Sequence, residues 1–262
     1  MVLTVRQIAV FPALLLLAAC ATTAVSTPPP PVTLAAVGEV RAGTGIPNGY
    51  VPQSQIPDSL ALLPPPPEAA SARFAADREA YQTAATSTTP ARWEQAARDA
   101  ALLFPASVKS FGDVLGITIS TDATPHLAML MQRTLVDAGL STRKAKAHYQ
   151  RTRPFVANNT TTCYPPDEKA LRTDGSYPSG HSAIGWVWAL VLTQVVPDKT
   201  DALLQRGFDF GQSRVVCRAH WQSDVEAGRV MAAAAFARLQ SDPAYQAQLA
   251  LARAEVAAAQ SR

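Results

Sequence analysis

The chain has 262 residues, a formal net charge of +3 at pH 7 and 16% charged residues. This small excess of positive charge does not indicate nucleic-acid binding, and a hydrophobic fraction of 48% excludes a disordered, highly charged chain. The length suits one large domain with a tail. Abundant Ala, the residue with the highest helix propensity, favours helices.

The N-terminus has the pattern of an export signal. An apolar run from Ile8 to Ala19 is too short to span a bilayer but has the length of a signal-peptide core, so residues 1–19 are predicted to be cleaved. The next residue completes the sequence Leu-Ala-Ala-Cys, which resembles the bacterial lipoprotein cleavage box and implies lipidation of Cys20. Cleavage without a lipid is the alternative. We expect a periplasmic protein, anchored to a membrane surface through the lipid.

Cysteine usage fits this location. If Cys20 is acylated, Cys163 and Cys217 remain as a pair, and an oxidising compartment favours a disulfide between them. Two buried free thiols are the alternative. The bond would close a loop of about 54 residues and stabilise the fold by roughly 4 kcal/mol on a chain-entropy estimate.

The N-terminal third begins with low-complexity sequence. Residues 20–55 include the run Pro28–Pro31 and predict an extended, Pro-rich tether. The more apolar stretch Ile56–Leu63 predicts an extended arm against the body, ahead of a second Pro run. We place the folded domain at residues 56–258.

Helical periodicity begins near Ser71 and continues to the C-terminal region. Pro90 and Pro125 stand where helices are expected to begin. A short helix is predicted over residues 142–151, and a loop over residues 158–177. Long helices are predicted over residues 181–196, 199–216, 221–240 and 243–258. Because no region alternates with period two, the pattern predicts an all-α fold, a single helical bundle.

Three polar clusters interrupt this pattern, and the first contains Lys146 and Arg153, followed by Pro154. Their spacing of seven residues is almost two helical turns, so we expect both cations on one face of a helix that Pro154 ends. Taken alone, the pair is better explained by a solvated basic stripe.

The second cluster is Pro178-Ser-Gly-His181, directly before an apolar helix. Ser179 and Gly180 would lie at the N-terminus of that helix, where free backbone N–H groups and a partial positive charge bind anions. Ser179 as a simple N-cap, with His181 at the surface, is the alternative. The chain has no G-x-S-x-G motif that would support a serine hydrolase.

The third cluster contains Arg214, His220 and Asp224. His220 and Asp224 are four apart on an expected helix, where a carboxylate would hold one ring nitrogen and leave the other free. A surface contact is the alternative. The cations of the three clusters indicate a phosphate-like oxyanion as ligand, and no set of carboxylates and His suits a metal site.

Together the clusters read K-x6-R-P, P-S-G-H and S-R-x5-H-x3-D, from Lys146 to Asp224. This combination resembles the phosphatidic-acid-phosphatase type 2 superfamily. The sequence D-S-L-A-L-L-P-P-P-P from Asp58, and Gly175-Ser-Tyr before the second cluster, resemble its class A bacterial non-specific acid phosphatases. The resemblance covers residues 50–240. It implies a helical bundle that hydrolyses phosphomonoesters without a metal ion or cofactor.

The resemblance also implies a role for each motif position. His220 corresponds to a nucleophile that becomes a phosphohistidine, Asp224 to the residue that orients it, and His181 to the general acid for the leaving group. The phosphate-binding positions would be Lys146, Arg153, Ser179, Gly180 and Arg214. A neutral His220 and a protonated His181 predict a bell-shaped pH profile with its maximum below pH 7.

Three other functions fit parts of the pattern. The superfamily includes lipid and pyrophosphate phosphatases, usually set among several membrane helices, and vanadate-dependent haloperoxidases, usually much longer chains. A non-catalytic phosphate-binding lipoprotein would need the cations but neither His181 nor the pair His220–Asp224. The expected partners are small phosphomonoesters, the membrane surface and, as the resemblance implies, a second copy of the chain; no nucleic acid is expected.

Several residues near the clusters match no motif position. Three aromatic residues are candidates for pocket walls, with packing as the alternative: Tyr164, Tyr177 and Trp221. Three basic residues are interpreted as structural or solvated: Arg151, Arg218 and His148.

Overall fold

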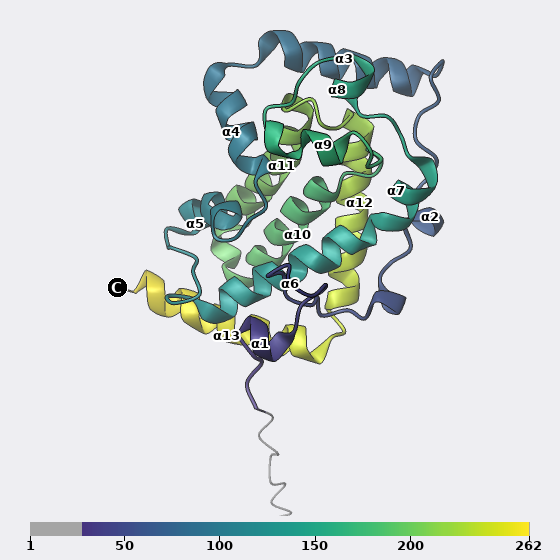
Figure 1. The fold of residues 1–262 in the computed structure, drawn as a ribbon. Coiled ribbons are helices and arrows are strands. Elements are labelled where there is room, and N and C mark those ends of the chain that lie inside the picture. Colours follow the sequence, from purple (N-terminus) through teal and green to yellow (C-terminus); the bar gives the residue numbers. More distant parts are fainter. Residues whose placement is uncertain (1–27, 262) are drawn as a thin grey trace, which may run out of the picture.

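The computed structural model describes residues 28–261 and confirms the all-α prediction (Figure 1). The predicted signal peptide and Cys20 lie outside the described residues. Within them, the one strand-like pairing is an isolated antiparallel bridge between Glu39 and Pro47. None of the helices in this part of the chain combines the length and apolar character needed to cross a membrane.

The helices begin where the sequence supplies capping residues. The side chains of Ser71, Thr89 and Asp242 each accept an N–H bond in the first turn of the helix that follows. The helices are α1 (Leu34–Val37), α2 (Ser59–Leu62), α3 (Ala72–Ser87), α4 (Pro90–Ala100), α5 (Lys109–Leu115), α6 (Pro125–Ser141), α7 (Arg143–Tyr149), α8 (Pro154–Ala157), α9 (Glu168–Leu171), α10 (Gly180–Val195), α11 (Thr200–Val216), α12 (Gln222–Leu239) and α13 (Pro243–Gln260).

Helix α10 forms the centre of the bundle, with α6, α11 and α12 packed around it (Figure 1). It is apolar on nearly every side and buries Val187, Trp188 and Leu192, as expected for an interior helix. Helix α11 approaches it closely at Gly207, where a Cβ atom would lie 2.5 Å from the Cβ of Ala189.

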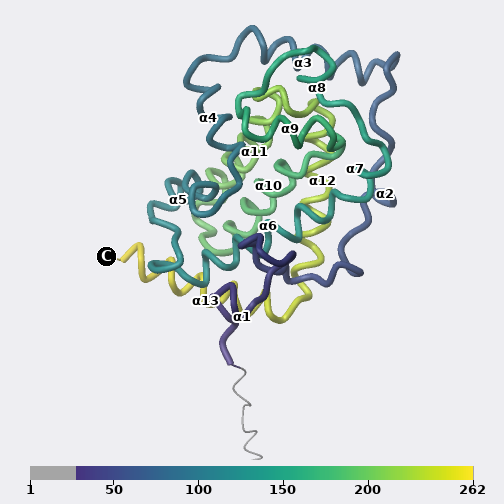
Figure 2. Tube along the Cα trace, in the orientation of Figure 1, coloured from purple at the N-terminus to yellow at the C-terminus, as the bar shows by residue number. Residues whose placement is uncertain are grey.

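The ends of α10, α11 and α12 meet near α3. Helix α3 packs across α11 and α12, whereas α13 lies beside α6 at the opposite end of the molecule (Figure 2). At the α3 end, the backbone N–H of Ser179 donates to the carbonyl of Asp224 at 2.9 Å. Gly228 permits this approach, because a Cβ there would lie 2.5 Å from the Ser179 carbonyl oxygen. The N-termini of α10 and α12 are thereby held together.

The segment predicted as a tether is packed against the body in its last part. Tyr50 and Val51 are buried, and their N–H groups donate to the carboxylate of Asp137 on α6 at 2.9 and 3.1 Å. Packing therefore begins before the predicted domain boundary at residue 56.

The stretch Ile56–Leu63 lies against the body as predicted but is not fully extended. It contains α2, because the Asp58 side chain accepts the N–H of Leu60 at 2.9 Å and caps a helical turn. The buried hydroxyl of Ser59 in this turn accepts the N–H of Ala145 at 2.9 Å and fixes the turn to α7.

Candidate active site

The prediction that Lys146 and Arg153 share one helical face was wrong. Helix α7 ends at Tyr149, because Gln150 adopts a left-handed conformation with φ of 42°. Pro154 does not end this helix but begins α8, a place where its fixed φ and missing N–H cost nothing.

The turn nevertheless brings the two cations together. Nζ of Lys146 and Nη2 of Arg153 lie 3.5 and 2.9 Å from the same carboxylate oxygen of Asp174. Both groups also donate to the carbonyl of Gly175, at 2.5 and 3.2 Å. The two cations of the first cluster are therefore adjacent, although they come from a helix and from the turn after it.

The second cluster has the predicted helix-terminal geometry. Ser179 is the N-cap of α10, and its hydroxyl accepts the N–H of Ser182 at 3.2 Å. Gly180 is the first residue of the helix. Ser179 is fully buried, whereas Gly180 and His181, the first two residues of the helix, are partly exposed.

His220 and Asp224 meet, but not on one helix as predicted. Arg218 has a φ of 61° and turns the chain after α11, so His220 lies in the linker and Asp224 in the first turn of α12. Nδ1 of His220 lies 3.4 Å from Oδ2 of Asp224. The same oxygen accepts the N–H of Trp221 at 2.8 Å, which fixes the carboxylate beside the ring.

The contact between Arg153 and His220 defines the protonation of the ring. Nη1 of Arg153 lies 2.9 Å from Nε2 of His220. A guanidinium only donates hydrogen bonds, so Nε2 must be the unprotonated nitrogen and the proton of the neutral ring is on Nδ1, facing Asp224. His220 thus presents a lone pair toward the cations.

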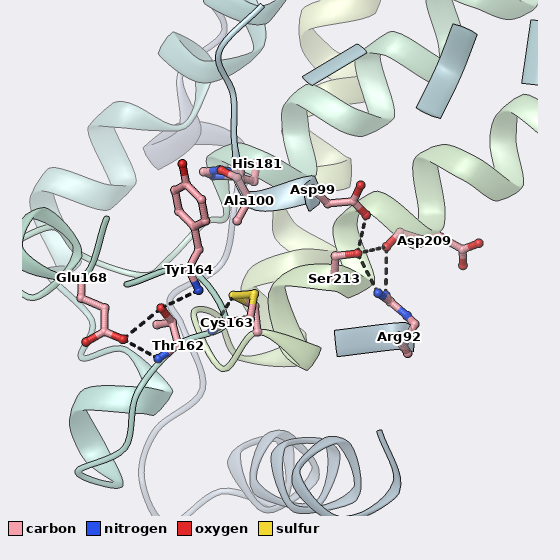
Figure 3. Close-up of a disulfide and its surroundings, with 11 residues drawn as sticks. Arg92, Asp99, Ala100, Thr162, Cys163, Tyr164, Glu168, His181, Asp209 and Ser213 are labelled. Atoms are coloured by element: carbon pink, nitrogen blue, oxygen red, sulfur yellow. Dashed lines mark hydrogen bonds between the residues drawn. A yellow bond between two sulfur atoms is a disulfide. The ribbon is translucent and has the colours of Figure 1, made fainter. Parts of the chain in front are cut away.

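His181 is held by a different kind of partner. Its Nε2 lies 3.0 Å from the carbonyl oxygen of Ala100, at the end of α4 (Figure 3). A carbonyl only accepts hydrogen bonds, so Nε2 carries a proton and Nδ1 is the nitrogen that remains for other partners.

Arg214 is the third predicted cation, and its side chain is buried on α11. Its Nε and Nη1 have no hydrogen-bond partner among residues 28–261. The neighbouring Ser213 donates to Asp99 at 2.6 Å (Figure 3). Asp99 also pairs with Arg206. This buried pair fixes α11 against α4 beside Arg214.

The charges of the site act strongly on the two imidazoles. Burial, and then the nearby cations, hold the pKa values of His181 and His220 well below the usual range. Burial and the neighbouring Arg153 also lower the pKa of Lys146 to about 8. The site is therefore a concentration of positive charge in which an anion is favourable, and a bound dianion would make both rings easier to protonate.

A buried network of ion pairs, which no motif of the sequence predicted, lies behind His220. Arg151, interpreted as structural or solvated, has a side chain only 9% exposed and bonds to Asp224 at 2.6 Å and to Asp77 at 2.7 Å. The solvated interpretation was therefore wrong. Asp77 comes from α3 and carries no local sequence signal for this partnership.

The other basic residues beside the motifs contact aromatic rings. The guanidinium of Arg218 lies 5.1 Å from the centre of the Trp93 ring, and the ring of His148 lies 4.7 Å from that of Tyr149. His148 is otherwise at the surface.

The three aromatic candidates for pocket walls divide into two kinds. Tyr177 donates to the carbonyl of Pro64 at 2.9 Å, and Trp221 to that of Thr152 at 2.9 Å, so both pack within the body. Tyr164 lines a pocket of about 500 Å³ beside His181.

The walls of this pocket are mostly apolar. They include Leu102, Leu103 and Phe104 from the loop after α4, and Ile46 from the N-terminal segment. Asp167 is the one carboxylate among the described residues that line it.

The predicted disulfide between Cys163 and Cys217 is present (Figure 3). Cys163 is adjacent to Tyr164 of the pocket, whereas Cys217 lies between Arg214 and His220 in the chain. The bond therefore joins the loop that lines the pocket to the segment that carries the third cluster.

Comparison with known proteins identifies the family. Residues 126–245 match the model of the PAP2 superfamily. A non-specific acid phosphatase of Providencia stuartii is 45% identical over 209 residues, which cover 79% of this chain and 84% of that protein. One of Salmonella typhi is 47% identical over 200 residues, covering 76% and 80%, and an acid phosphatase of Zymomonas mobilis is 38% identical over 199 residues, covering 76% and 75%. The chain belongs to the PAP2 superfamily, and within that superfamily it is an acid phosphatase.

Proposed function

We propose that the protein hydrolyses phosphomonoesters through a phosphohistidine formed on His220, without a metal ion. The observation that carries the proposal is the 2.9 Å contact between Arg153 and Nε2 of His220. It directs the lone pair of Nε2 to the Arg153 guanidinium, and the lone pair becomes available for attack when that guanidinium turns to the oxygens of a bound phosphate. A substrate phosphate that bound the cations of the site would bring its phosphorus to that lone pair.

The reaction then proceeds in two transfers. Nε2 of His220 attacks phosphorus, the bond to the ester oxygen breaks, and Nδ1 of His181 gives its proton to the leaving oxygen. Water next attacks the phosphohistidine and returns a proton to His181, which releases phosphate and neutral His220. Asp224, whose Oδ2 lies 3.4 Å from Nδ1 of His220, compensates the positive charge of the intermediate.

The phosphate oxygens would be bound by charge and by the end of α10. Lys146, Arg153 and Arg214 supply three cations, and Ser179 and the N–H of Gly180 supply neutral donors. Phosphoryl transfer depends mainly on positioning and charge stabilisation, so three fixed cations suit a dianion.

The leaving group would occupy the pocket beside His181, because the proton donor must contact the ester oxygen. The apolar walls and the carboxylate of Asp167 favour an uncharged aryl or alkyl group over one that carries a second phosphate. The enzyme would therefore accept many small phosphomonoesters but prefer apolar ones.

We further propose export to the periplasm. Residues 1–19 would be removed, Cys20 lipidated, and the Pro-rich segment 20–55 would connect the lipid to a catalytic domain of residues 56–258. The disulfide supports an oxidising compartment. We also propose that the protein forms a homo-oligomer, as the family resemblance implies.

The test is hydrolysis of p-nitrophenyl phosphate between pH 4 and 9 in the presence of EDTA. We expect wild-type activity to resist EDTA, and His220→Ala to lose activity by roughly a thousandfold or more. His148→Ala, which removes a surface His outside the site, is the matched control and should retain activity. Persistent activity in His220→Ala, or loss of wild-type activity with EDTA, would refute the proposal.

A further inference from the structure

We propose that Arg151 and Asp77 are positioning residues for the nucleophile: they hold Asp224 in place as a carboxylate, and Asp224 in turn holds His220. The inference rests on the proposed phosphohistidine route.

A continuous chain of contacts connects the four residues. Nη2 of Arg151 bonds to Oδ2 of Asp77 at 2.7 Å, and its Nη1 bonds to Oδ1 of Asp224 at 2.6 Å. Oδ2 of Asp224 then faces Nδ1 of His220 at 3.4 Å. The four residues come from α3, the turn after α7, the first turn of α12 and the linker before α12. The contacts therefore connect the His220 ring to three other segments.

The two oxygens of Asp224 have separate tasks. Oδ1 is bound by Arg151, whereas Oδ2 accepts the N–H of Trp221 at 2.8 Å and faces His220. A rotation of the carboxylate would break both sets of contacts. Arg151 therefore fixes the orientation in which Oδ2 meets the ring.

Asp77 fixes Arg151 and the start of α12 together. Its Oδ1 accepts the N–H of Ser223 at 2.8 Å, and its Oδ2 accepts the Ser223 hydroxyl at 2.6 Å. That hydroxyl also accepts a bond from Nη1 of Arg151 at 2.8 Å. A carboxylate at a helix N-terminus is favourable in itself, and here it is also the counter-ion that keeps Arg151 in place.

The ion-paired side chains of Asp77, Arg151 and Asp224 are shielded from water. Asp77 and Asp224 are 2% and 0% exposed in their side chains. The guanidinium of Arg151 also lies 5.7 Å from the centre of the Phe74 ring and 5.6 Å from that of Trp221. Charges held in such surroundings interact more strongly than they would at the surface.

The balance of charge suits a cationic intermediate. Two carboxylates and one guanidinium leave one negative charge, which a phosphorylated, positively charged His220 would neutralise. Burial raises the pKa of Asp224, and Arg151 is the largest opposing influence. The other charged or titratable groups near Asp224 are Lys146 of α7, Arg153, Tyr177 and His220. Without Arg151, the buried carboxylate would be protonated at a higher pH.

The test compares Arg151→Met, Arg151→Lys and Asp77→Asn with Arg229→Met, a control that removes an Arg of α12 packed 4.8 Å from the centre of the Phe208 ring. For Arg151→Met we expect kcat to fall roughly a hundredfold with KM changed less than about threefold. The acidic limb of the kcat profile should move to higher pH, because Asp224 loses its charge sooner as pH falls. Arg151→Lys should recover part of kcat, and Asp77→Asn should fall between it and Arg151→Met.

Each variant is first checked for folding by its melting curve and for binding of inorganic phosphate. If Arg151→Met does not fold, Arg151→Lys and Asp77→Asn carry the test through the shift of the acidic limb. An unchanged kcat and acidic limb in the folded variants, or a change in KM alone, would overturn the inference. If His220→Ala is active, the proposed function itself fails; if His220→Ala is inactive and the Arg151 variants behave as wild type, only this inference fails.

Discussion

The two His residues of the site are held in opposite ways. His220 is buried and faces a carboxylate, behind which Arg151 and Asp77 form an ion-pair chain. His181 is bound by a neutral backbone carbonyl, that of Ala100, and borders an apolar pocket. One ring is therefore backed by charge and the other by a dipole.

This difference matches the two roles proposed for them. A nucleophile that becomes a phosphohistidine gains positive charge, and a buried carboxylate stabilises that charge. A general acid must release its proton, and a neutral carbonyl fixes the ring through Nε2 without adding a negative charge that would retain the proton on Nδ1. The contrast shows how one cationic pocket can contain two imidazoles with different chemistry.

The largest loss of kcat is expected when the carboxylate of Asp224, which faces His220, is removed. In Asp224→Asn we expect kcat to fall roughly a thousandfold to ten-thousandfold, because the amide neither fixes the Nδ1–H tautomer nor compensates the cation. Steady-state kinetics give kcat, and binding of phosphate to the variant checks that the site is intact. A loss of less than tenfold would mean that the charge behind His220 is unimportant.

A smaller and substrate-dependent effect is expected on the His181 side. His181→Gln retains an N–H donor for the Ala100 carbonyl but cannot act as an acid. We expect a fall of roughly a hundredfold or more in kcat with an alkyl phosphate, and a clearly smaller one with p-nitrophenyl phosphate, whose leaving group needs no proton. Equal losses with both substrates would contradict the acid role.

The sequence pattern predicted the helices of the site and its two His residues, but not the partners that hold each ring. The helices after residue 180 follow their apolar periodicity and caps, so their bounds were close to those of α10 to α13. Nothing in the motif indicates that Gln150 adopts a left-handed conformation. The sequence therefore placed Arg153 on the helix of Lys146, whereas it lies after the end of that helix. Asp77 is 74 residues from Arg151 in the chain, and the Ala100 contact is made by the backbone. Neither partner can be inferred from a local motif.

His181 should take up a proton when a dianion binds, whereas His220 must stay neutral to act as the nucleophile. Burial and neighbouring cations hold the pKa of His181 low, and a bound anion raises it, so anion binding becomes tighter as pH falls. Sulfate is a suitable probe because it stays a dianion across this range. We expect its affinity to rise by up to about tenfold per unit fall in pH around neutrality, with proton uptake measured by calorimetry in two buffers. An affinity independent of pH would contradict the coupling.

The smallest effect is expected in the pocket wall beside His181. Leu103→Asp should lower kcat/KM for phenyl phosphate by about tenfold while changing that for glycerol phosphate little, because one apolar contact is lost. Leu62→Asp, at an exposed apolar residue of α2, is the control. Equal effects on both substrates would place the leaving group elsewhere.

In the proposed reaction His220, the ring that faces a carboxylate, carries the phosphoryl group. The most direct measurement is mass spectrometry of the enzyme quenched at alkaline pH during turnover, with His148→Ala and His220→Asn as controls. We predict one acid-labile phosphoryl group on the peptide that contains His220, in wild type and His148→Ala but not in His220→Asn. Turnover by wild type without such a group, or with the group on another residue, would contradict the account.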